Sequence, residues 1–155
     1  MWDTKTFIFL DANYRSDGRR FDVAGVEWTD SNLPHEQCSF LKTALENRDD
    51  TCIVCIHENL DPFVETHHIV KNAEEIRKII QESGKVQLVL QGHYHIGAEH
   101  TIDGIPYVTL PAMCEGMGNS YRVLTLPGFY LFSPPFLTDF YTFFPYDPRG
   151  VCGGF

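Results

Sequence analysis

The stretch from Val86 to His95, VQLVLQGHYH, joins an apolar run to a polar segment. Its first five residues, Val86–Leu90, are an apolar run of the length expected for a buried strand. A polar segment with Gly92 and two histidines, His93 and His95, follows at once. Residues two apart in an extended segment face the same way, so we expect both imidazoles to point into one site.

An earlier apolar run, Cys52–Ile56 (CIVCI), ends at His57. Near-continuous apolar strands are typical of parallel sheets that are covered on both faces. Because parallel strands deliver their ends to one edge of the sheet, we expect His57 to join His93 and His95 there. Three imidazoles at one rim suit Mn, Zn or Fe ions. From the spacing alone, a hydrogen-bonded surface pair explains the two neighbouring histidines equally well.

The remaining patterns predict alternating strands and helices. The further elements expected are a strand over Thr6–Leu10, a helix from Pro34, a helix from Asn72 to Gly84, hairpin strands Glu99–Ile102 and Ile105–Leu110 joined at Asp103-Gly104, and a strand over Ser120–Leu126. Asn72 with Glu75 three residues later has the spacing of a capping box. This order predicts an α/β fold, a mixed β-sheet with flanking helices.

Composition excludes several classes of protein. The 155 residues suffice for one ordinary domain, and the net charge of −9 disfavours binding to duplex nucleic acid. The sequence has no run of about 18 apolar residues, so we expect no membrane span. Five scattered cysteines form no disulfide framework, which favours a reducing, cytoplasmic location. Cys52 and Cys55 lie three apart in a strand and face opposite ways, so we expect no metal or redox site there.

Residues 127–155 differ in kind from residues 1–126. They hold 10 aromatic residues and 5 prolines but only 3 charged residues. We predict an aromatic- and proline-rich C-terminal extension that folds back over exposed core, since aromatic rings bury a large area. The alternative is a contact with another chain.

Together these motifs resemble one known family, the calcineurin-like metallophosphoesterases. The resemblance rests on the strand ending in His57, on QGHYH after a buried strand, and on IDGIPYVTLPAMCEG, which follows. It implies half of a four-layer α/β/β/α sandwich, with residues 1–126 as a partial metallophosphoesterase domain. It also implies hydrolysis of phosphate mono- or diesters by metal-activated water, with His57 and His93 binding one divalent ion and His95 the other.

The first half of the family pattern does not occur in this sequence. The family's Asp-x-His, Gly-Asp and Gly-Asn-His motifs supply a bridging aspartate, an asparagine ligand and a catalytic histidine, so we assign no catalytic residue. Without an anionic ligand, two cations at close range would repel each other. We therefore expect a hydrolase-family chain that is inactive or incomplete alone, or completed by an oligomer or a partner chain. The alternative is a non-catalytic metal-binding or protein-interaction module.

Other polar residues are weaker candidates. Glu58, beside His57, is a candidate base or hydrogen-bond acceptor behind the ligands, and Cys114-Glu115-Gly116 is a candidate substrate contact. His67 and His68 are adjacent in a predicted loop, so we expect them to diverge and to be solvated. We expect His35 and His100 to be structural or exposed.

Overall fold

The computed structural model describes residues 5–21, 27–114 and 124 of the chain. The chain divides into one compact unit over Thr4–Ala112 and a second over Met1–Asp3 with Met113–Phe155. The helices and strands of the described residues all belong to the first unit. Apart from Leu124, the predicted strand over Ser120–Leu126 and the predicted extension over 127–155 lie outside the described residues, and both stay predictions.

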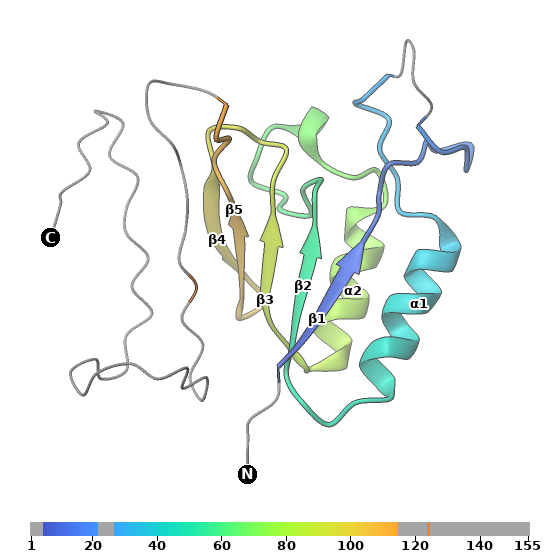
Figure 1. Ribbon diagram of the computed structural model, residues 1–155, viewed down its shortest axis with the longest axis vertical. Helices are drawn as coiled ribbons and strands as arrows, with labels where there is room; N and C mark the ends of the chain where they lie inside the picture. The colour runs from blue at the N-terminus through green and yellow to red at the C-terminus, as the bar shows by residue number, and fades with distance from the viewer. Residues whose placement is uncertain (1–4, 22–26, 115–123, 125–155) are drawn as a thin grey trace, which may run out of the picture. The chain divides into compact units, whose positions relative to one another are not determined.

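A five-stranded sheet with the strand order β1-β2-β3-β5-β4 forms the first unit (Figure 1). The strands are β1 (Thr6–Leu10), β2 (Cys52–Ile56), β3 (Val86–Gln91), β4 (Ala98–Ile102) and β5 (Ile105–Thr109). The neighbouring pairs β1–β2, β2–β3 and β3–β5 are parallel, and β4 pairs antiparallel with β5. The predicted mixed sheet is therefore confirmed.

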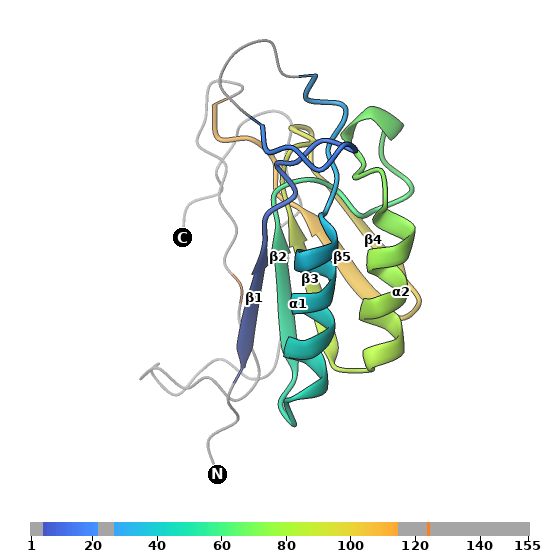
Figure 2. The ribbon, with the colours of Figure 1, turned by 90° about the vertical axis from the view of Figure 1, so that its right-hand side faces the viewer.

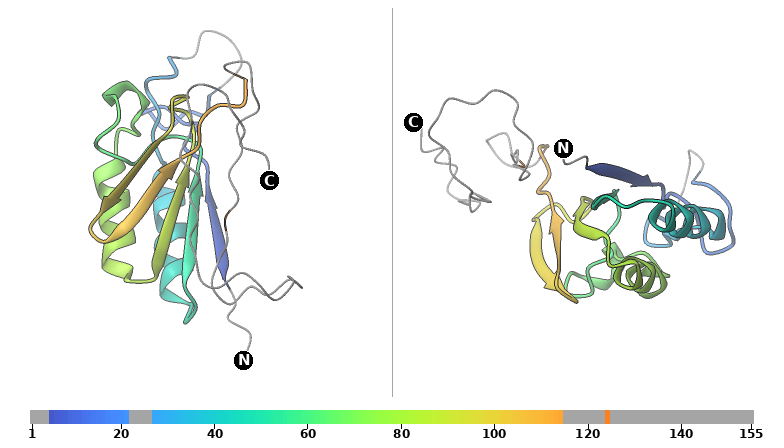
Figure 3. Two further views of the ribbon diagram at one scale, coloured as in Figure 1. Left: turned by 90° about the vertical axis from the view of Figure 1, so that its left-hand side faces the viewer. Right: turned by 90° about the horizontal axis from the view of Figure 1, so that it is seen from below.

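Two helices, α1 (His35–Glu46) and α2 (Ala73–Ser83), cover one face of the sheet (Figures 2 and 3). The helix predicted from Pro34 begins one residue later, with Pro34 at its N-cap. Each helix turns an apolar stripe toward the core, whose members include Leu41, Leu45, Ile76, Ile80, Ile8, Val54 and Val89. Burying each such side chain contributes about 1.5–3 kcal/mol. No helix of the described residues is long and apolar enough to cross a membrane.

The end of α2 follows the prediction, but its start does not. Gly84 takes a left-handed φ of 62° at the C-cap, and its N–H donates to the Gln81 carbonyl. Asn72 makes no side-chain capping hydrogen bond, so the predicted capping box with Glu75 is wrong. Asn72 Oδ1 instead accepts from Leu33 N–H at 3.0 Å, and Nδ2 donates to Leu33 O at 2.9 Å. Two backbone partners thus replace the local cap and tie α2 to the segment before α1.

The parallel strands end together at one edge of the sheet, here called the carboxyl edge (Figure 1). His57 follows β2 there, and residues 92–97 follow β3. The connection from β2 to α2 contains a single 3₁₀ turn, η1 (Thr66–His68). Ligand sites of open α/β sheets lie at this edge.

Candidate metal centre

Five of the seven histidines gather at the carboxyl edge, and we call His57, His67, His68, His93 and His95 the histidine cluster. The ring centroids of His57 and His93 lie 5.2 Å apart, as do those of His68 and His93. His95 interacts electrostatically with both His68 and His93. The expected meeting of His57 with His93 is therefore observed.

The backbone brings His57 and His93 together. Gly92 N–H donates to His57 O at 2.9 Å. A Cβ at position 92 would lie 3.2 Å from His57 Nδ1, so any other residue would crowd the His57 ring. His93 itself has a φ of 64°, which residues with a side chain rarely adopt. Backbone strain of this kind gathers at functional sites.

The geometry of the two histidines after β3 differs from the prediction. Strand β3 ends at Gln91, and residues 92–97 turn instead of continuing as an extended segment. Tyr94 N–H donates to Gly92 O at 2.7 Å, which closes this turn. His93 and His95 therefore do not share a face through strand alternation. The turn brings both of them to one hollow.

An open hollow of about 520 Å³ lies at the carboxyl edge. The three predicted ligands, His57, His93 and His95, line it together with apolar side chains such as Phe9 and Leu110. No carboxylate is among the described residues that line it. All three histidines line the same hollow, and their ligand roles stay a prediction.

Electrostatics at the hollow favour a neutral His93. Burial, followed by the charges of His57 and the other cluster histidines, lowers the pKa of His93 to about 4. Its ring is therefore neutral at pH 7 and keeps a lone pair for a metal ion. Glu58 is 2% exposed, its Oε2 has no hydrogen-bond partner among the described residues, and burial raises its pKa. Its predicted role behind His57 stays a prediction.

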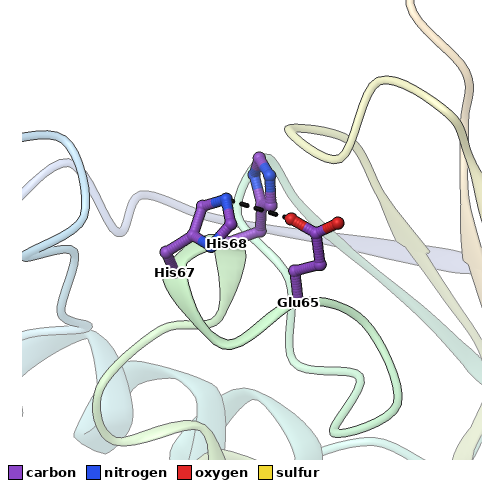
Figure 4. A group of neighbouring side chains, drawn as sticks. All are labelled: Glu65, His67 and His68. Carbon is purple, nitrogen blue, oxygen red and sulfur yellow. Dashed lines mark ion pairs between the residues drawn. The ribbon is translucent and has the colours of Figure 1, made fainter.

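A second group of ligand atoms converges beside the hollow. Atoms of Glu65, His67 and His68 lie within 4.8 Å of one another (Figure 4). The ring centroids of His67 and His68 are 4.2 Å apart. The expectation that these adjacent histidines diverge is wrong, because the tight η1 turn and the ring of Trp28, 5.5 and 5.4 Å from theirs, hold them together.

Trp28 contacts the histidine cluster, although no motif in the sequence marks it. Its ring lies 5.3 Å from that of His93 as well as beside His67 and His68, and the residue is 44% exposed. The available signal was a large aromatic residue in the polar segment Glu27–Asp30.

Buried Asn59 links the two histidine-bearing turns. Its N–H donates to His68 O at 3.2 Å, and its carbonyl accepts from Val70 N–H at 3.0 Å. Its side-chain Nδ2 donates to Gly92 O at 2.7 Å, and Oδ1 accepts from Thr109 Oγ1 at 2.6 Å. One residue therefore fixes η1 relative to the turn after β3.

The other candidates lie apart from the cluster. Exposed His35 is 3.4 Å from Ser39 Oγ on α1, and His100 Nδ1 is 2.6 Å from the buried Asp61 Oδ2, so the expected structural or exposed positions of both are confirmed. Cys52 belongs to the core, whereas Cys55 lines the hollow, as opposite faces of a strand require. Cys114 is exposed, and Glu115 and Gly116 lie outside the described residues.

Comparison with known proteins gives a likeness of fold. No family model matches the chain, and no curated protein sequence matches it. Among solved structures, it is similar to a dimetal phosphatase from Danio rerio, with a TM-score of 0.50 and 18% sequence identity. The likeness covers 53% of this chain and 28% of that chain, so this chain spans less than a third of the other protein's length. The α/β fold class is therefore shown.

Proposed function

We propose that this chain is a metallophosphoesterase-type domain that binds divalent metal ions through His57, His93 and His95. One observation carries the proposal. The ring centroids of His57 and His93 lie 5.2 Å apart at the ends of β2 and β3, and both residues line the hollow. A fold similar to part of a dimetal phosphatase supports it. Following the family resemblance, His57 and His93 serve one ion and His95 the other.

The donors fit such an ion. Neutral imidazoles are good ligands for Mn, Zn and Fe, and the low pKa of His93, about 4, keeps its ring neutral. Gly92 leaves the space beside His57 Nδ1 that a side chain would fill. A bound divalent ion would supply Lewis-acid stabilisation of the charge that develops on a phosphate ester during hydrolysis.

The chain's own residues shape the place for the ester. The hollow has about the volume of a small-molecule site, and its apolar wall with Phe9 and Leu110 suits an organic substituent on the phosphate. Glu58 adds a buried carboxyl group next to His57 in sequence. Burial raises the pKa of this carboxyl group, and the charge of His57 acts against that rise. Glu58 is therefore kept as the candidate base or hydrogen-bond acceptor behind His57.

Hydrolysis of bis(4-nitrophenyl) phosphate by the Mn²⁺-loaded full chain tests this proposal. Where the full chain turns over alone, the rate should fall more than about 100-fold in His93→Ala, since the loss of even an outer-shell partner costs a metal site about 10–100-fold. His35→Ala is the matched control, because His35 is an exposed histidine outside the cluster. Equal rates in the two variants would contradict the proposal.

A second candidate is a metal-binding module without catalysis. The absence of a carboxylate among the described residues that line the hollow favours it, because such a site has no anionic group to hold two cations close together. Metal bound to the purified chain without turnover would select this candidate. Sedimentation of the same sample tests whether an oligomer forms. Turnover that appears only after a partner chain with the family's other motifs is added would support the first proposal.

A further inference from the structure

Glu65, His67 and His68 form a group of ligand atoms outside the lining of the hollow. Glu65 Oε2 lies 3.2 Å from His67 Nε2, and the side chains of these two residues are 57% and 47% exposed. Figure 4 shows the carboxylate facing the His67 ring, with the His68 ring beside them. Two of the three ligand side chains are therefore accessible to solvent.

The backbone that carries these ligands is fixed on both sides. Within the turn, His68 N–H donates to Glu65 O at 2.9 Å, and Ile69 N–H donates to Thr66 O at 3.2 Å. Outside the turn, Asn59 N–H donates to His68 O, and Asn59 O accepts a hydrogen bond from Val70 N–H. A ligand set held in place by its own turn and by a buried neighbour loses little entropy on binding.

His68 supplies an observation independent of this convergence. Its Nδ1 is buried and has no hydrogen-bond partner among the described residues. A buried polar atom without a partner costs free energy comparable to a lost hydrogen bond. A metal ion coordinated by Nδ1 itself would satisfy it.

We propose that Glu65, His67 and His68 bind a divalent transition-metal ion of the zinc class, at a site separate from His57, His93 and His95. Two imidazoles and one carboxylate are a ligand set that zinc takes in proteins, and open positions remain for water. The carboxylate supplies the negative charge that the described lining of the hollow lacks. The site does not rest on the proposed hydrolysis, because none of its three ligands is used there.

Zinc stoichiometry of the full chain tests the site. Zn²⁺ bound after equilibrium dialysis is measured for the wild type, Glu65→Gln and His67→Ala, with Glu82→Gln and His35→Ala as controls. Glu82 is an exposed carboxylate, 3.9 Å from Lys78 on α2, and His35 is an exposed imidazole on α1. We expect each site variant to lose one equivalent of zinc or to bind it more than about tenfold more weakly, while the controls bind as the wild type does.

Trp28 provides a second readout, because its ring lies 5.5 and 5.4 Å from the rings of His67 and His68. In a Trp2→Phe background Trp28 is the one tryptophan of the chain. We expect Co²⁺ to quench its fluorescence in a saturable manner, with a midpoint that shifts more than about tenfold in Glu65→Gln and stays in place in Glu82→Gln. Glu65→Gln keeps the side-chain shape, so a folded variant is expected, and circular dichroism checks it.

The outcomes separate this site from the proposed function. Zinc binding that is unchanged in Glu65→Gln and His67→Ala overturns the site, whatever happens at the hollow. Loss of one equivalent in these variants and of another in His93→Ala supports both sites. Loss in Glu65→Gln with wild-type binding in His93→Ala supports this site and contradicts the proposed one.

Discussion

Two turns bring histidines to the carboxyl edge, and they are anchored differently. The turn after β3 continues a central strand and stays beside the sheet, since Gly92 N–H binds His57 O and Leu110 N–H binds Gln91 O. The η1 turn lies in the long connection from β2 to α2 and is held by Asn59. A strand end thus places ligands through sheet register, whereas a loop needs a buried polar residue to hold it.

The largest change in stability is expected when the link between the two turns is broken. Asn59→Ala removes the hydrogen bonds of its side chain to Gly92 and Thr109 in a buried place. We expect the free energy of unfolding to fall by about 2–4 kcal/mol, because hydrogen bonds are lost and buried polar groups lose partners. Urea unfolding measures this change.

The control for this prediction is Asn47→Ala. Its side chain also donates one hydrogen bond, to Thr43 O at 2.9 Å, but at the exposed end of α1. We expect a loss of no more than about 1 kcal/mol. Equal losses of unfolding free energy in the two variants would contradict the proposed link, because Asn59 would then contribute no more than an exposed asparagine.

A glycine pair separates site geometry from backbone strain. Gly92→Ala places a Cβ 3.2 Å from His57 Nδ1, whereas Gly84→Ala meets no atom within 4 Å but keeps a φ of 62°. We expect Gly92→Ala to weaken Zn²⁺ binding by about tenfold. Gly84→Ala should leave binding intact and lower stability by about 1 kcal/mol. Calorimetric titration and urea unfolding test both, and unchanged binding in Gly92→Ala refutes the close-approach argument.

A smaller effect concerns the strain in the turn after β3. His93 has a positive φ and His95 does not. His93→Gly relieves strain, so we expect its unfolding free energy to stay within about 0.5 kcal/mol of the wild type, although ring contacts are lost. His95→Gly should lose about 0.5–1 kcal/mol, the ordinary cost of glycine. A larger loss in His93→Gly than in His95→Gly would contradict this account of the turn.

The smallest effect is chemical. Burial raises the pKa of the Cys38, Cys52 and Cys55 thiols, so little reactive thiolate forms at pH 8. In a variant that lacks Cys114 and Cys152, we expect slow reaction with a disulfide reagent until urea unfolds the chain. Rapid reaction of the folded variant would contradict this, since it would show that at least one of these three thiols is reactive in the folded chain.

Much of the fold could be predicted because its signals are local. Apolar runs marked β1, β2 and β3, and Asp103-Gly104 forms the predicted hairpin turn with both residues at positive φ. The meeting of His57 and His93 followed from one rule, that parallel strands end at one edge. The predicted capping box does not form, because the side chain of Asn72 is hydrogen-bonded to the backbone of Leu33, 39 residues away in the chain.

The rest of the site depends on contacts that no local pattern encodes. His67 and His68 converge because Trp28 and Asn59, from other segments, hold η1 in place. The carboxylate of Glu65, two residues before the histidine pair, was the one local signal for this group. Residues 92–97 form a turn that strand periodicity cannot foresee.

Histidine-ring NMR of the full chain during a Zn²⁺ titration shows directly whether the histidine cluster is the metal-binding centre. All seven histidines lie in the described residues, and His35 and His100, outside the cluster, serve as internal controls. We predict that the ring resonances of His57, His67, His68, His93 and His95 shift saturably while those of His35 and His100 stay in place. Resonances of the cluster that stay unchanged, or that move no more than those of His35 and His100, would contradict metal binding at the histidine cluster.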